Sequence, residues 1–85
     1  NSLIAIHNGT HPYKVCRYFL DKEGKHVLKM TYIDNNRSEL DQPTQGVING
    51  RHFYYLANSP WNAYDKQGNF TPQKENRVLI MKSKL

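Results

Sequence analysis

The side chains that could carry chemistry in this sequence are few and widely spaced. Its four histidines, at positions 7, 11, 26 and 52, lack the spacing of a zinc site. No Ser-His-Asp set, glycine-rich phosphate loop or Cys-x-x-Cys pair is present. We expect Cys16, the single cysteine, to be a small buried apolar residue rather than a nucleophile, because it lies in an apolar run. Asp41 is a candidate general acid or base, with a surface loop carboxylate as the alternative.

Three aromatic residues lie in the long polar stretch of residues 58–76, namely Trp61, Tyr64 and Phe70. Long structured loops commonly carry function, and rings that gather in one can form a rim that holds a ligand. The alternative is that the rings pin the loop over the last strands. Trp61 and Tyr64 are therefore ligand-rim candidates.

Composition limits the class of protein and its partners. A chain of 85 residues with 38% hydrophobic residues permits one small domain with a limited core. Its net charge is +5, but no block of consecutive basic residues occurs, so nucleic acid is not an expected partner. No apolar run reaches the ~20 residues that a transmembrane helix needs. Asn-x-Ser/Thr triplets at Asn8, Asn36 and Asn69 favour a secreted or periplasmic location, although an asparagine-rich chain produces such triplets by chance.

Short apolar runs separated by turn residues must position these candidates, because helical periodicity is almost absent. Strands are predicted over residues 3–6, 13–20, 26–33, 44–48, 52–57 and 77–82. The run 26–33 alternates as an edge strand does, and the run 52–57 is apolar on both faces, as in a strand packed between two layers. Gly24 predicts a hairpin loop, and Asn49-Gly50 predicts a type I′ turn in which both residues have positive φ.

An internal repeat links the two halves of the chain. Residues 3–8 align with residues 53–58, since each is an apolar strand that ends in Asn and is followed by a small residue. A polar stretch comes next, and then a basic residue that leads a second apolar strand, at residues 14–16 and 77–79. The period of about 50 residues suits β-propeller blades, each a four-stranded antiparallel sheet.

Two stretches also carry a resemblance to a known family. The first runs from Pro43-Thr44-Gln45-Gly46-Val47 through Phe53-Tyr54-Tyr55-Leu56-Ala57-Asn58-Ser59 to Trp61-Asn62 and Tyr64-Asp65-Lys66-x-Gly68. The second is Asn1-Ser2-Leu3-Ile4-Ala5-Ile6-x-Asn8-Gly9, followed by Val15-x-Arg17-Tyr18-x-Leu20-Asp21. They resemble the closing blade and the blade before it in six-bladed β-propellers of the senescence-marker/gluconolactonase-like superfamily and its NHL-type neighbours.

The resemblance implies an all-β fold, an antiparallel β-propeller segment of about two incomplete four-stranded blades. Residues 1–35 would form a partial blade of three strands, residues 36–43 a connection, and residues 44–85 a partial closing blade with the long loop 58–76. We therefore expect a C-terminal fragment of a propeller protein. Incomplete blades leave apolar faces and strand edges uncovered, so its expected partners are copies of itself or the missing blades.

The resemblance also implies a site at the mouth of the propeller channel. Thr44 and Gln45 match the segment that enters the channel, and Asn58 matches a position where relatives carry Asp or Asn. In lactonase relatives an axial divalent cation is held by Glu, Asn and Asp side chains, so Asn58 is a candidate ligand for Ca²⁺ or another divalent cation in the full-length protein. The alternative for Asn58 is a turn cap, and no carboxylate stands at these positions. Asp41 completes the channel-mouth candidates.

Two functions follow for the full-length protein. The first is a lactonase-like, metal-dependent hydrolase whose active site is assembled from several blades. The second is a non-catalytic propeller module that binds a protein or a ligand. A third hypothesis, independent of the propeller, is a small basic β module that contacts nucleic acid, because the net charge is +5. In each case the 85-residue chain carries no complete active site, and we expect it to be inactive as an enzyme.

Overall fold

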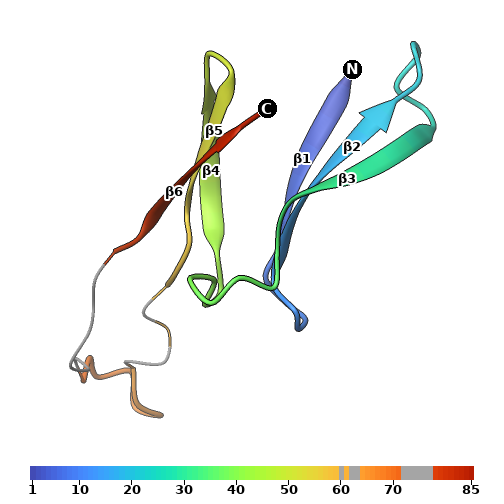
Figure 1. Cartoon of the computed structure of the whole chain (residues 1–85). Coiled ribbons are helices and arrows are strands. Elements are labelled where there is room, and N and C mark those ends of the chain that lie inside the picture. The colour runs from blue at the N-terminus through green and yellow to red at the C-terminus, as the bar shows by residue number, and fades with distance from the viewer. Residues whose placement is uncertain (60, 62–63, 72–77) are drawn as a thin grey trace.

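The computed structural model describes residues 1–59, 61, 64–71 and 78–85, and it contains two three-stranded antiparallel sheets (Figure 1). The strands are β1 (Ser2–His7), β2 (Lys14–Leu20), β3 (Val27–Asn35), β4 (Thr44–Asn49), β5 (His52–Leu56) and β6 (Ile80–Lys84). Sheet 1 has the order β1-β2-β3 and sheet 2 the order β4-β5-β6. The prediction of an all-β fold is confirmed. In the described part of the chain, no helix has the length and apolar character to cross a membrane.

Glycines lie in the turns that join neighbouring strands, as predicted, but the type of one turn differs from the prediction. Gly24 has a φ of 73° and closes the β2–β3 loop, as predicted. In the β4–β5 turn, however, Asn49 pairs with His52 and is the last residue of β4, so the two loop residues are Gly50 and Arg51. Of these two residues only Gly50 has a positive φ, of 64°, which is the pattern of a type II′ turn. The prediction of a type I′ turn centred on Asn49-Gly50 is therefore wrong.

Strand β6 lies further along the chain than predicted. The prediction covered residues 77–82, of which residue 77 lies outside the described residues, whereas the strand is Ile80–Lys84. Its position is fixed by pairing with β5, in which Leu56 lies opposite Ile80. In sheet 1, Ile6 lies opposite Val15 in the same way. The repeat partner of Val15 is therefore Ile80, and not Val78 as the sequence alignment predicted.

The core lies between the facing sides of the two sheets. Sheet 1 contributes Ile4, Ile6 and Val15, and sheet 2 contributes Phe53 and Tyr55. Burial of each large apolar side chain stabilises the fold by roughly 1.5–3 kcal/mol. Successive side chains of a strand point to opposite faces, so Cys16 lies on the outer face of sheet 1, where it is buried, as predicted.

A β-bulge in β3 brings a carboxylate into this core. Val15 pairs with Asp34 and Cys16 pairs with Tyr32, so Ile33 is an extra residue in β3. The bulge interrupts the alternation of side chains and directs Asp34 toward sheet 2. The predicted strand ended at Ile33, one residue before Asp34. The strand instead continues to Asn35, and Asp34 is only 7% exposed.

The Asp34 carboxylate joins β3 to both neighbouring strands of sheet 2. The Tyr55 hydroxyl donates a hydrogen bond to Asp34 Oδ2 at 2.5 Å, and the Ser83 hydroxyl donates to the same oxygen at 3.2 Å. Arg37 Nη1 lies 3.5 Å from Asp34 Oδ1. Burial raises the pKa of Tyr55 well above its ordinary value of 10.0, and the hydrogen bond to the carboxylate raises it further. This polar contact fixes how the two sheets sit on each other.

The contact between Asp34 and Tyr55 is expected to contribute measurably to stability. Asp34→Asn and Tyr55→Phe should each lower the free energy of unfolding by about 1–3 kcal/mol, because the first replaces a charged acceptor with a neutral one and the second removes one of the two hydroxyl donors to Asp34 Oδ2. The double variant should lose less than the sum of the two, since the residues interact directly. Urea unfolding measures all three values, with Tyr54→Phe on the other face of β5 as the matched control. Additive losses would contradict a direct interaction.

The same contact predicts a loss of stability at alkaline pH. The unfolded chain releases the Tyr55 proton near pH 10, whereas the folded chain retains it, so the free energy of unfolding falls as the pH rises above that value. The contribution of Tyr55 approaches about 1.4 kcal/mol per pH unit. Unfolding curves of the wild type and Tyr55→Phe between pH 8 and pH 11 test this, because the wild type should lose stability more steeply. Parallel pH profiles would exclude Tyr55 as the source.

Candidate functional site

The segment before β4 and the segment after β5 lie side by side at one end of sheet 2. Asp41 and Asn58 form a parallel β-bridge. The Asp41 N–H donates to the Ala57 carbonyl at 2.9 Å, and the Ser59 N–H donates to the Asp41 carbonyl at 3.0 Å. These backbone bonds bring together two of the channel-mouth candidates, Asp41 and Asn58, and the other two, Thr44 and Gln45, begin β4 three residues after Asp41.

A second β-bulge, at Gln45, shapes this region. Thr44 pairs with Leu56 and Gly46 pairs with Tyr55, which leaves Gln45 as an extra residue with a φ of 34°. The left-handed region costs a non-glycine residue roughly 1–2 kcal/mol. Bulges of this kind re-aim a side chain and are frequent beside functional sites. The exposed Gln45 side chain therefore does not follow the regular alternation of side chains between the two faces of β4.

Gly46 follows the bulge at a position where no side chain fits. A Cβ atom built there would lie 2.2 Å from Cζ of Phe53 and 2.9 Å from the Tyr54 carbonyl oxygen. The Phe53 ring is itself 5% exposed and stacked on Tyr55, with ring centroids 5.6 Å apart. The bulge and the aromatic core beneath it are therefore packed as one unit.

An open pocket of about 240 Å³ lies beside the bulge, and we call it the rim pocket. It is lined by Thr44, Gln45, Ser59, Trp61 and Tyr64. Four of the six predicted candidates thus line one pocket, while Asp41 and Asn58 meet in the bridge described above. Ser59 was missed as a site residue, and its hydroxyl lies 3.4 Å from that of Thr44. The feature of the sequence that could have pointed to Ser59 is its position directly after Asn58.

A small hairpin presents the aromatic side of the rim pocket. Tyr64 and Phe70 form an antiparallel bridge with ring centroids 5.4 Å apart, and Trp61 lies 6.4 Å from Tyr64. Asp65 Oδ1 accepts hydrogen bonds from the N–H groups of Asn69 and Gln67, at 2.8 and 2.9 Å, and these bonds lower the pKa of Asp65. Trp61 remains 65% exposed and Tyr64 47% exposed, so both rings offer free surface to a ligand.

The oxygen atoms in this region do not by themselves fit a hard divalent cation. Asn58 Oδ1 accepts a hydrogen bond from the Leu79 N–H at 3.0 Å, across a separation of 21 residues in the sequence. Thr44, Ser59 and Gln45 offer neutral oxygens, whereas Ca²⁺ takes about six to eight oxygen ligands, with carboxylates among them. Among residues 1–59, 61, 64–71 and 78–85, no three His, Cys, Asp or Glu side chains gather in a metal-binding arrangement. Metal ligation by Asn58 stays a prediction.

Across the part of the chain that the structure describes, the fold is that of a small all-β protein with two three-stranded antiparallel sheets. No family model matches its sequence, and no curated protein or solved structure is significantly similar to it.

The bulge predicts opposite effects for substitutions at two adjacent positions. Gln45→Gly should raise the free energy of unfolding by about 1 kcal/mol, because glycine adopts a positive φ without strain. Gly46→Ala should lower it by about 1–3 kcal/mol, because the added methyl group collides with the Phe53 ring. Gly9→Ala is the control, since a Cβ there meets nothing within 4 Å. Urea unfolding measures all three, and a loss of stability in Gln45→Gly would contradict the assignment of strain.

Proposed function

We propose that the chain forms two neighbouring blades of a six-bladed β-propeller of the gluconolactonase-like, NHL-related type. The observation that carries the proposal is the way in which the two sheets are stacked. β1 and β5 run in the same direction, each toward the connection that joins the sheets (Figure 1). Asn8 Nδ2 donates to the Pro43 carbonyl at 3.1 Å, which sets the end of β1 beside the start of β4. Asp34 and Ser83 likewise set β3 beside β6.

Equivalent faces of the two sheets therefore point the same way. Ile4 and Ile6 of β1 face sheet 2, whereas their repeat partners in β5, Tyr54 and Leu56, lie on the outer face of sheet 2. A two-fold sandwich would turn equivalent faces toward each other. Rotation of one sheet onto the next, without inversion, is the relation between successive propeller blades. The remaining blades would come from other parts of a longer protein or from further copies of this chain.

Ligand binding at the rim pocket is the activity that the side chains support best. In a propeller of this type, β4 would be the inner strand of its blade and the rim pocket would open at the channel mouth. Two exposed aromatic rings, three hydroxyl groups (one of them the phenol of Tyr64) and an amide suit a small ligand with an apolar ring face and several hydroxyl groups. A sugar lactone, the substrate class that the family resemblance implies, has this chemistry.

Hydrolysis is the second candidate activity, and it would need groups from the missing blades. Asp41 is the one carboxylate among the channel-mouth candidates, and it stands outside the rim pocket. A general base and any cation-binding carboxylates would therefore have to come from other blades. We expect the 85-residue chain to bind a lactone and leave it intact.

Trp61 is the only tryptophan and lines the rim pocket, so its fluorescence reports on this site. Titration with glucono-δ-lactone should change the emission of Trp61 to a saturating value. Thr44→Val should weaken binding about tenfold, the effect of one lost hydrogen bond of about 1.4 kcal/mol. Thr31→Val, the same change at an exposed position of sheet 1, is the control.

Two results would count against this proposal. An emission that does not change at millimolar lactone would exclude the rim pocket as the lactone site. Turnover of the lactone by the purified chain would show that its residues already form a complete active site, contrary to the proposed division among blades.

A further inference from the structure

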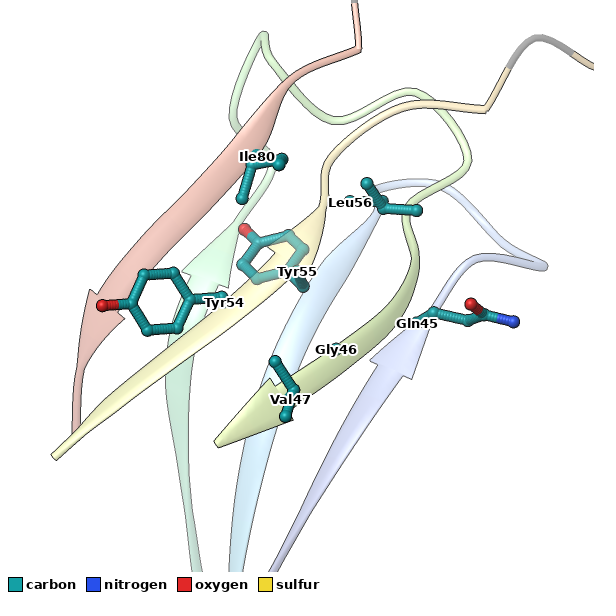
Figure 2. A pocket seen from close by; sticks show the side chains of 7 residues that line it. All are labelled: Gln45, Gly46, Val47, Tyr54, Tyr55, Leu56 and Ile80. Atoms are coloured by element: carbon teal, nitrogen blue, oxygen red, sulfur yellow. The ribbon is translucent and has the colours of Figure 1, made fainter. Parts of the chain in front are cut away.

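The outer face of sheet 2 is an apolar surface with a groove in it. Val47 is 62% exposed and Ile80 is 65% exposed, and they flank the half-buried Tyr54 and Leu56. The four residues come from all three strands of the sheet and line a groove of about 310 Å³ (Figure 2). We call this surface the sheet 2 outer face. A patch of this kind on a small protein marks an interaction site.

The outer face of sheet 1 is apolar as well. Leu3 is 59% exposed, Met30 40% and Tyr32 52%, and the three residues come from its two edge strands. Tyr18 of the central strand pairs with both Leu3 and Met30, and its hydroxyl lies 3.0 Å from His7 Nε2. Cross-strand partners share a face, so these side chains form one continuous surface, which we call the sheet 1 outer face.

The contact inside the chain shows which surfaces fit each other. There, the inner face of sheet 1 packs on the inner face of sheet 2. By the strand register, Ile4, Ile6 and Val15 of that contact are the repeat partners of Tyr54, Leu56 and Ile80 on the sheet 2 outer face. The sheet 2 outer face therefore corresponds, position by position, to the inner face of sheet 1, on which sheet 2 packs.

The same equivalence holds for the other half of the contact. Phe53 and Ser83, on the inner face of sheet 2, are the repeat partners of Leu3 and Tyr18 on the sheet 1 outer face. The chain thus exposes one surface of each kind, and the two kinds pack together inside the chain. The sheet 2 outer face, which corresponds to the inner face of sheet 1, is free at one end of the stack. The sheet 1 outer face, which corresponds to the inner face of sheet 2, is free at the other end.

We propose that a second copy of the chain packs its sheet 1 outer face on the sheet 2 outer face of the first, head to tail. The inference rests on the stacking relation used for the proposed propeller, but it requires only the contact and not a closed ring. A head-to-tail contact leaves free surfaces at both ends and continues to further copies. In the six-bladed ring of the proposed function, three copies would supply the six sheets.

Lysine substitutions on either outer face test the contact. The wild-type chain should exceed its monomer mass of 10.0 kDa in light scattering as its concentration rises. Ile80→Lys on sheet 2 and Leu3→Lys on sheet 1 should each weaken association about a hundredfold, because each buries a charge in an apolar interface. Ile48→Lys is the matched control, since Ile48 is 56% exposed but pairs with Phe53 on the inner face of sheet 2. It should associate as the wild type does.

Mixing the two variants separates a head-to-tail contact from a symmetric one. Leu3→Lys retains an intact sheet 2 outer face, and Ile80→Lys retains an intact sheet 1 outer face. Each variant alone should be a monomer, and an equimolar mixture should form a heterodimer that stops at two copies. Formation of that heterodimer also demonstrates that both variants are folded.

Three outcomes would overturn the proposed contact. These are a wild-type chain that stays monomeric at every concentration, association that persists in either single variant, and a mixture of variants that remains monomeric while circular dichroism shows both to be folded. A wild-type mass that grows beyond three copies would support the head-to-tail contact and contradict the closed ring of the proposed function. A stable trimer that fails to bind lactone would leave the contact intact and exclude the rim pocket as a lactone site.

Discussion

The buried carboxylate of Asp34 determines how the two sheets sit on each other. Asp34 lies in an apolar interface, where an ionised group is strongly unfavourable unless it is paired and hydrogen-bonded. Its partners, Tyr55 and Ser83, come from two strands of the opposite sheet. Sliding one sheet by a single residue would leave the carboxylate and both hydroxyl groups without these partners. The apolar side chains supply most of the attraction, and the carboxylate selects one alignment among several that they would allow.

Two β-bulges connect this alignment to the surface. The bulge at Ile33 turns Asp34 into the interface, and the bulge at Gln45 re-aims a side chain toward the rim pocket. Tyr55 links the two, because it bonds Asp34 through its hydroxyl and pairs through its backbone with Gly46, directly after the second bulge. The shape of the rim pocket therefore depends on Tyr55, which also takes part in the contact with Asp34 that aligns the sheets.

Local patterns in the sequence were sufficient to predict the strands of sheet 1 and, in sheet 2, β4 and the central strand β5. Apolar runs and turn glycines depend on neighbouring residues alone, so they are readable without a structure. Asp34 was not predictable, because a polar residue at the end of a strand becomes a core residue only through a bulge and a partner far along the chain. The predicted start of β6 was wrong for a related reason, because the pairing with β5, and not local hydropathy, determines where β6 begins. Trp61 and Tyr64 were predicted from their residue types, whereas Ser59 lines the rim pocket only because the backbone bond to Asp41 brings it beside Thr44.

The separations of the contacts along the chain also imply an order of folding. β1, β2 and β3 pair through short loops, as do β4 and β5, so these meanders close at a small cost in loop entropy. β5 ends at Leu56 and β6 begins only at Ile80, and Ser83 reaches Asp34 over a separation of 49 residues. Contacts of this range form slowly, because the chain loses the loop entropy before they stabilise it. We therefore expect sheet 1 and the β4–β5 hairpin to form first, and the docking of β6 on both to complete the fold.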